Sequence, residues 1–326
     1  MARDYRIDSI KGLLIILVVI GHVILALDNA NVINHGVMGL IYMFHMPLFI
    51  LISGYLTKSP GEQPAGKMWK GVLEIFITLV IFQLLSAVRV YFYGGDFVKA
   101  LEAFPFGVLW YLLSLIYWRI LLYYSPRWLL QRPAVYLGIA LVVSVLCGLT
   151  HLGKPLSLQR TMNFYVFFLL GYYYRQGMLP SQWWHNNWLH GAVCLVLLPV
   201  IFWLYPHCGN VMNGADHYGL PGIPQKVLIL TCSIAMTLLV FNMMRDVTWL
   251  RPIGRDSLFY YLYHIFFISG VIEPLGKLHG WPTSFPFILL YSAAVMAVLL
   301  LMSKVGFFKW LMHPTFKKSS PGKPSN

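Results

Sequence analysis

Charged side chains are scarce in this sequence. Only 11% of its 326 residues are Asp, Glu, Lys or Arg, whereas 58% of the chain is hydrophobic. Long apolar runs are spread along the whole chain, and the mean hydropathy is +0.67. Soluble domains rarely have such a composition. The sequence therefore predicts an all-α fold, a polytopic membrane helical bundle, with no separate soluble domain.

Two other kinds of signal are missing. The four cysteines do not have the paired spacing of zinc sites. His207 and His217 lie in a long polar segment, but no second pair of ligands accompanies them. We therefore expect no metal site. The first apolar segment has no convincing small-residue cleavage site, so we also expect no cleavable signal peptide.

The apolar runs divide into about ten candidate transmembrane helices, separated by short polar or Gly- and Pro-containing stretches. The sixth is the shortest, and the ninth contains a histidine. The predicted spans are 10–27, 37–56, 71–93, 106–124, 133–150, 161–175, 188–205, 225–243, 257–272 and 285–308.

The basic residues support this division. If the N-terminus is cytoplasmic, 18 of the 24 Lys and Arg lie at cytoplasmic ends of the spans and 6 at outer ends. This asymmetry follows the positive-inside rule and predicts that both termini are cytoplasmic. It also accounts for the net charge of +13 by attraction to membrane lipids, with no nucleic acid involved. The six outer residues are Arg89, Lys99, Lys154, Arg160, Lys226 and Lys277.

The last residues differ from the rest. Positions 317–326 contain only Lys, Ser, Pro, Gly and Asn. Such a segment cannot bury a core, so we expect a disordered basic cytoplasmic tail on the inner leaflet. The membrane domain is accordingly expected over 1–316.

Lys11 and His22 mark one face of the first span. They are eleven residues apart, and at about 100° per residue eleven steps return to within about 20° of the same face. The two side chains are then about 16 Å apart along the helix axis. Both groups are costly in lipid, so their face is expected to line the bundle interior or a wet cavity. Two structural alternatives stay open: Lys11 reaching the headgroups, and His22 donating to a neighbouring carbonyl.

Polar residues and helix breakers interrupt later spans. His45 stands just before Pro47, which is expected to kink the second span beside a cavity or a neighbouring helix. Gly54 would let another helix approach closely. His264 lies about two turns into the ninth span. For His45 a hydrogen-bonded structural role, and for Trp110 an aromatic belt, are the simpler explanations.

Several motifs together resemble the family 3 membrane acyltransferases, most closely the branch described as fucose 4-O-acetylase-like. A basic residue followed by a histidine eleven positions later on the first helix is the central motif of that family. The resemblance covers nearly the whole chain. The matching stretches are Arg6-Ile7-Asp8-Ser9-Ile10-Lys11-Gly12 with His22, Phe44-His45-Met46-Pro47-Leu48-Phe49, Ser53-Gly54-Tyr55, Trp110-Tyr111-Leu112, Phe168-Leu169-Leu170-Gly171-Tyr172, and Gly254 through His264.

The resemblance implies a membrane-embedded O-acyltransferase in the bacterial inner membrane. Such an enzyme moves an acyl group, usually acetyl, from cytoplasmic acetyl-CoA to a hydroxyl of a cell-surface glycan or a lipid-linked sugar precursor. Acetyl-CoA is then the donor substrate, and no tightly bound cofactor is expected. The acceptor sugar, the need for a second protein and the oligomeric state stay open.

The resemblance also suggests roles for individual residues. His22 would be the general base or an acyl-carrying nucleophile, and Lys11 would bind the donor or stabilise charge. Many family members have Arg in place of Lys11, and Lys cannot form the same two-pronged hydrogen bonds. The candidates for orientation or proton relay are His45, His264, Ser53 and Trp110. The candidates for holding the CoA phosphates are Lys67, Lys70, Arg175, Arg251 and Arg255.

Two other classes of protein remain in view. Histidines within the membrane and a proline-broken helix also suit a proton-coupled transporter of a small solute. Such carriers often contain inverted repeats, and this chain shows no convincing internal repeat. A membrane scaffold without activity is the third class, and the polar face of the first helix argues against it.

Overall fold

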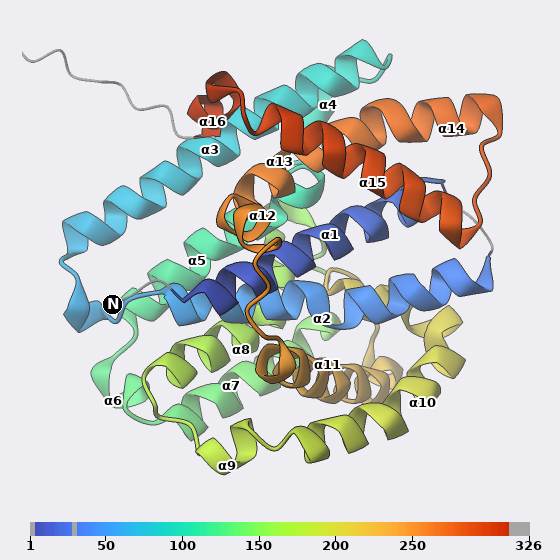
Figure 1. The fold of residues 1–326 in the computed structure, drawn as a ribbon. Helices are drawn as coiled ribbons and strands as arrows, with labels where there is room; N and C mark the ends of the chain where they lie inside the picture. The colour runs from blue at the N-terminus through green and yellow to red at the C-terminus, as the bar shows by residue number, and fades with distance from the viewer. Residues whose placement is uncertain (1–3, 28–30, 313–326) are drawn as a thin grey trace, which may run out of the picture.

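All regular secondary structure in the described part of the chain is helical. A computed structural model describes residues 4–27 and 31–312, without the side chains of 204–213, and these ranges contain no β-strand (Figure 1). The predicted tail at 317–326 lies outside the described residues. The α-helices are α1 (Tyr5–Leu27), α2 (Val32–Leu56), α3 (Ala65–Phe92), α4 (Phe97–Glu102), α5 (Trp110–Tyr124), α6 (Arg127–Leu130), α7 (Pro133–Leu146), α8 (Leu158–Arg175), α9 (Ser181–Trp184), α10 (Asn187–Asn213), α11 (Ile223–Met243), α12 (Arg251–Arg255), α13 (Ser257–Phe267), α14 (Glu273–His279), α15 (Phe285–Met302) and α16 (Gly306–Met312).

The predicted all-helical fold is confirmed, and it contains several candidate membrane-spanning helices. In the described residues, seven helical segments are long and apolar enough to cross a membrane. They comprise α1, α2, α3, α15 and the segments Phe97–Tyr124, Leu220–Met243 and Ser257–His279. The predicted spans at 133–150 and 188–205 fall on α7 and α10, whose apolar stretches, Pro133–Leu149 and Asn187–Trp203, are shorter. The span at 161–175 falls on α8. The count of ten spans and the cytoplasmic location of both ends stay predictions.

The first two helices form the centre of the bundle. In Figure 1, α1 and α2 run antiparallel through the middle, with α3, α14 and α15 to one side and α7, α10 and α11 to the other. Helix α2 packs against α8 and α11, and α1 packs against α12, α13 and α15. In the most apolar stretch of α1, 61% of residues are buried, compared with 28% for the peripheral α15. Several polar side chains on α1 and α2 are buried in this centre: Asp8, Ser9, Asn34 and His45.

Two glycines let α2 and α8 approach closely. A Cβ atom added to Gly54 would lie 1.9 Å from the carbonyl oxygen of Phe168, and one added to Gly171 would lie 1.8 Å from that of Leu51. Both clashes are with backbone, which cannot move aside as a side chain can. The expectation that Gly54 permits close helix approach is confirmed, and its neighbour is α8.

A second close crossing joins α1 to α12. A Cβ on Gly254 would meet the Asp8 carbonyl oxygen at 1.6 Å, and one on Gly12 would meet that of Leu250 at 2.4 Å. These glycines lie 242 positions apart in the sequence, within the two end motifs of the chain. They bring the start of α1 against the segment that leads into α13.

The helix boundaries differ from the predicted ones in three places. Helix α1 begins at Tyr5, so Asp8 lies within its first turn instead of ahead of it. Helix α10 continues to Asn213, beyond the predicted end of its span at 205. The span predicted to end at 272 passes through a π-helical turn, Ile268–Ile272, and continues as α14 to His279. Apolar runs indicate which part of a helix is buried. The helix itself extends as far as its backbone hydrogen bonds continue, so its ends can lie beyond the apolar run.

Candidate functional site

Three histidines from different helices gather in the bundle. The rings of His22 on α1 and His264 on α13 are 4.9 Å apart between centroids and meet edge to face. Tyr42 on α2 connects His22 to His45, with ring separations of 6.5 Å and 5.0 Å. His45 is 3% exposed and His264 is fully buried. Of the residues proposed from sequence, these three are therefore brought together by the fold.

Each histidine is oriented by its own helix. Nδ1 of His22 lies 2.9 Å from the carbonyl oxygen of Val18, and His45 and His264 make the same contact with the carbonyls four residues before them, at 2.7 Å and 3.1 Å. A carbonyl oxygen can only accept, so each Nδ1 carries the hydrogen. The Nε2 atom of each neutral ring is then left as an acceptor. The structural alternative for His22 is realised, and it also prepares the ring as a base.

Nε2 of His264 is buried and has no hydrogen-bond partner among the described residues. Buried polar atoms are usually paired, and an exception at a polar cluster marks a place where a proton or a ligand is exchanged. No group of three or more metal-ligating side chains occurs in the described ranges.

A cavity of about 630 Å³ opens beside the cluster. His22 and His45 line it, together with apolar residues of α1 and α2. In the part of the chain that the structure describes, no Asp or Glu lines this cavity. Its volume is typical of sites for small molecules. Its other polar or aromatic lining residues are Tyr42, Trp110, Lys154, Arg160, Phe164 and Tyr261.

Ser53 stands behind the cavity wall. Its hydroxyl is 2.6 Å from the Tyr111 hydroxyl and donates to the Phe49 carbonyl oxygen. The Tyr111 ring contacts the Tyr261 ring, 5.5 Å away, and Tyr261 lines the cavity. Trp110 lines the cavity directly. Ser53 thus reaches the cavity only through two tyrosines.

Lys11 lies at the other end of α1. Its ammonium forms an ion pair with Asp8 at 3.2 Å, and its side chain is 18% exposed. Eleven residues of helix separate it from His22 by about 16 Å, and it is not among the residues lining the cavity. The shared helix face is present, but the fold places the two groups in different surroundings.

None of the five basic residues proposed for CoA lines the cavity. Lys67 and Lys70 are exposed at the start of α3. Arg175 donates to the Thr57 carbonyl at 2.8 Å and pairs with Glu62 at 3.2 Å. Arg251 pairs with Asp246, and Arg255 with Asp256. Their role in phosphate binding stays a prediction, and Arg175 and Arg251 also bond residues of neighbouring loops.

The pair of Asp246 and Arg251 shapes the electrostatics near the start of α1. Arg251 donates to both carboxylate oxygens of Asp246, and the Ser9 hydroxyl donates to one of them at 3.1 Å. These bonds, the one from Arg251 foremost, hold the pKa of the Asp246 carboxyl below its usual value. This loop therefore carries a carboxylate under ordinary conditions.

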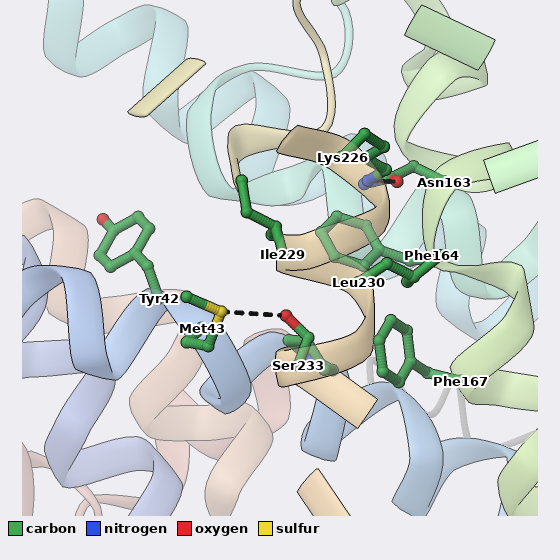
Figure 2. Close-up of a pocket in the computed structure, with 10 residues that line it drawn as sticks. Tyr42, Met43, Asn163, Phe164, Phe167, Lys226, Ile229, Leu230 and Ser233 are labelled. Carbon is green, nitrogen blue, oxygen red and sulfur yellow. Dashed lines mark hydrogen bonds between the residues drawn. The ribbon is translucent and has the colours of Figure 1, made fainter. Parts of the chain in front are cut away.

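Sequence reasoning missed Arg160, Lys154 and Lys226 as site residues. The Arg160 guanidinium lies 5.1 Å above the Trp110 ring, and Arg160 and Lys154 line the cavity. Figure 2 shows Lys226 bonded to Asn163 in a smaller adjoining pocket, which shares Tyr42 and Phe164 with the main cavity. The available signal was their predicted outer side of the membrane, because basic residues at outer ends are disfavoured.

The chain is similar to known proteins over most of its length. The family model described as acyltransferase domain, of acyltransferase family 3, matches residues 4–304. A nodulation protein NolL from Sinorhizobium fredii is 50% identical over 58 residues, which are 17% of this chain and 16% of that protein. Another nodulation protein NolL, from Mesorhizobium japonicum, is 26% identical over 224 residues, 61% of this chain and 54% of that protein.

These matches differ in what they cover. The chain spans about half the length of one curated relative and a smaller part of the other. No solved structure matches significantly. The family match covers nearly the whole chain, including α1, α2, α8 and α13, on which the cavity is built. The chain therefore belongs to the family 3 acyltransferases.

Proposed function

We propose that this membrane acyltransferase transfers an acetyl group from cytoplasmic acetyl-CoA to a hydroxyl of a cell-surface glycan or a lipid-linked sugar precursor. Its location would be the bacterial inner membrane. The observation that carries the proposal is the pair of rings, His22 and His264, beside a cavity within the bundle of a family 3 acyltransferase. Transfer to a hydroxyl needs a base, and His22 Nε2 is an oriented acceptor at the cavity.

The chemical step follows from this geometry. His22 Nε2 takes the proton from the acceptor hydroxyl while that oxygen attacks the thioester carbonyl. The new C–O bond forms, the C–S bond breaks, and the proton passes to the departing thiolate of CoA. A base positioned in this way contributes about 10²- to 10⁴-fold in rate.

The neighbouring rings would assist His22. His264 packs edge to face on the His22 ring, and its own Nε2 is buried without a hydrogen-bond partner among the described residues. His45 lines the same cavity behind Tyr42. We assign His264 and His45 to orientation and proton relay, because they lie near His22 but are not themselves the proposed base. Trp110 would form part of the acceptor wall, and Ser53 would position Tyr111.

Lys11 would act on the donor side. It lies about 16 Å along the helix from His22, near the segment that carries Asp246 and Arg251. Lys67, Lys70, Arg175, Arg251 and Arg255 are the predicted cytoplasmic cations for the CoA phosphates. The long, slender pantetheine arm of CoA suits a donor whose phosphates stay on that side while its thioester reaches the cavity.

The test measures transfer from radiolabelled acetyl-CoA by the purified full chain in liposomes that contain a lipid-linked sugar. His22→Ala should lower the transfer rate by about 10²-fold or more while CoA still binds. Lys11→Ala should raise the KM for acetyl-CoA. His279→Ala is the matched control, because His279 is exposed at the end of α14, and it should leave both quantities unchanged.

Two results would contradict the proposal. A folded His22→Ala protein that transfers acetyl at the normal rate would remove His22 from the chemistry. A folded wild-type protein that neither binds nor turns over acetyl-CoA would instead favour a proton-coupled transporter.

A further inference from the structure

Positive charge gathers at the cavity on the side opposite to Lys11. Arg160 and Lys154 both line the cavity, and Lys226 is buried in the adjoining pocket. These three belong to the six basic residues that the predicted topology places outside. Basic residues on that side are disfavoured during insertion. Because three of the six predicted outer basic residues lie at this cavity or its adjoining pocket, we expect them to contribute to ligand binding.

The wall of the cavity presents Arg160 to its interior. Arg160 and Phe164 are four residues apart on α8 and share a face. The Phe164 ring stacks on the Trp110 ring with centroids 5.5 Å apart, and the guanidinium lies 5.1 Å from the Trp110 ring centre. A guanidinium held over an indole is stiffened and keeps its positive charge at the cavity.

Lys226 braces this wall from behind. It is 3% exposed, and its ammonium donates to the Asn163 side-chain oxygen (Figure 2). The Ser144 hydroxyl donates to the Asn163 backbone carbonyl at 2.7 Å. Asn163 directly precedes Phe164, so these bonds fix the turn of α8 that forms the wall. The partner of Lys226 is a neutral amide, which does not cancel the positive charge of the ammonium.

We propose that Arg160 and Lys154 form a subsite for a phosphate group carried by the acceptor near the hydroxyl that is acylated. Both side chains are suited to phosphate. No Asp or Glu among the described residues lines the cavity, so its cations attract anions even though Asp216 acts electrostatically on Arg160 from outside the lining. Because it assigns the cavity to the acceptor, the subsite rests on the proposed function. The predicted CoA-binding cations lie elsewhere and line no part of this cavity, so the phosphate belongs to the acceptor.

Binding of two matched probes tests the subsite. The probes are octyl glucoside 6-phosphate and neutral octyl glucoside, titrated calorimetrically into the full chain in nanodiscs of phosphatidylcholine. Wild type should bind the phosphate about tenfold more tightly or better, as expected for a charge-assisted hydrogen bond. Arg160→Gln and Lys154→Gln should each lose most of this preference. Arg160→Lys should keep part of it and shows that position 160 tolerates replacement.

Lys99→Gln is the matched control. It removes a cation from the same predicted side, at a side chain that is 81% exposed and does not line the cavity, so the preference should persist. Equal wild-type affinity for the two probes would overturn the subsite, as would a preference retained in both Gln variants.

A competition arm separates the two sources of phosphate. Saturating CoA should leave binding of the phosphorylated probe unchanged. Displacement of the probe by CoA, with weaker CoA binding in Arg160→Gln, would assign the cations to the donor and overturn the proposal. Acetyl-CoA turnover without a phosphate preference would remove only the subsite. A phosphate preference without any turnover would remove only the proposed transferase activity.

Discussion

At the residue scale, the position of a side chain on its helix decides what it can do. His22, His45 and His264 all use Nδ1 to bond the carbonyl one turn earlier. What distinguishes them is their surroundings: His22 and His45 line the cavity, and His264 is sealed behind His22. In the proposed function, the same local bond therefore serves one base and two supporting rings.

Asp246 provides a pH-dependent prediction at this scale. Its folded-state pKa is lowered, first by the bond from Arg251. The pair therefore contributes stability above the unfolded value of about 3.9, and this contribution is lost as the pH falls through the lower folded value. In thermal unfolding, wild type should exceed Asp246→Asn in Tm at pH 6, and the difference should shrink below about pH 4.

Glu102→Gln serves as the comparison for that prediction, since Glu102 is exposed on α4. Its Tm difference from wild type should stay small over the same range. A constant difference between wild type and Asp246→Asn from pH 6 to pH 3 would show that the pair with Arg251 does not stabilise the fold.

At the element scale, the crossing of α2 and α8 holds the site together. Helix α2 carries Tyr42 and His45, and α8 carries Arg160 and Phe164, all of which line the cavity. The crossing is close only because Gly54 and Gly171 leave room for the opposite backbone. The π-helical turn begins at Ile268, about one turn after His264, and such turns are frequent at functional sites.

Gly54→Ala tests the crossing. The new methyl group would overlap the Phe168 carbonyl, so the helices must separate, and we expect a loss of about 1–3 kcal/mol in unfolding free energy. Acetyl transfer should fall as well, because the two walls of the cavity would shift. Thermal or denaturant unfolding of the purified protein measures the first effect, and the liposome assay measures the second.

Gly36→Ala on the same helix is the matched control. A Cβ there meets no atom within 4 Å, and Ala is favoured over Gly in a helix by about 1 kcal/mol. It should leave stability equal or slightly higher. If Gly54→Ala proved as stable as Gly36→Ala, the close α2–α8 crossing would be wrong.

At the scale of the whole molecule, the topology decides which face the cavity serves. The predicted arrangement puts Lys67 and Gln182 in the cytoplasm and Lys99 and Leu220 outside, and all four positions are exposed. Single cysteines at these positions, in sealed vesicles of known orientation, report their side by reaction with a membrane-impermeant maleimide. The background protein lacks Cys147, Cys194, Cys208 and Cys232.

We expect the probe to label Lys99→Cys and Leu220→Cys from the outer side and to leave Lys67→Cys and Gln182→Cys protected. Gln182 and Leu220 flank α10, so they test whether this helix, whose apolar stretch is short, crosses the membrane. Outer labelling of Gln182→Cys would reduce the number of spans below ten and reverse the assignment of sides after α7.

The sequence predicted the features that depend on local pattern. Apolar runs and the positive-inside asymmetry indicated a helical membrane protein, and the eleven-residue spacing placed Lys11 and His22 on one face. The order of motifs such as Phe44 to Phe49 pointed to the acyltransferase family, which is confirmed. These conclusions need only hydropathy, charge and helix period, which are properties of neighbouring residues.

Tertiary structure alone decided which helices meet. His22 and His264 are 242 positions apart in sequence, yet their rings are in contact. Lys11, on the same helix face as His22, is paired instead with Asp8 outside the cavity. From the sequence, Arg160 was only one of the basic residues on the predicted outer side. The crossing of α2 and α8 places it on the cavity wall. Such neighbours depend on close packing at glycines such as Gly54 and Gly254, and no local pattern contains the partner of a helix.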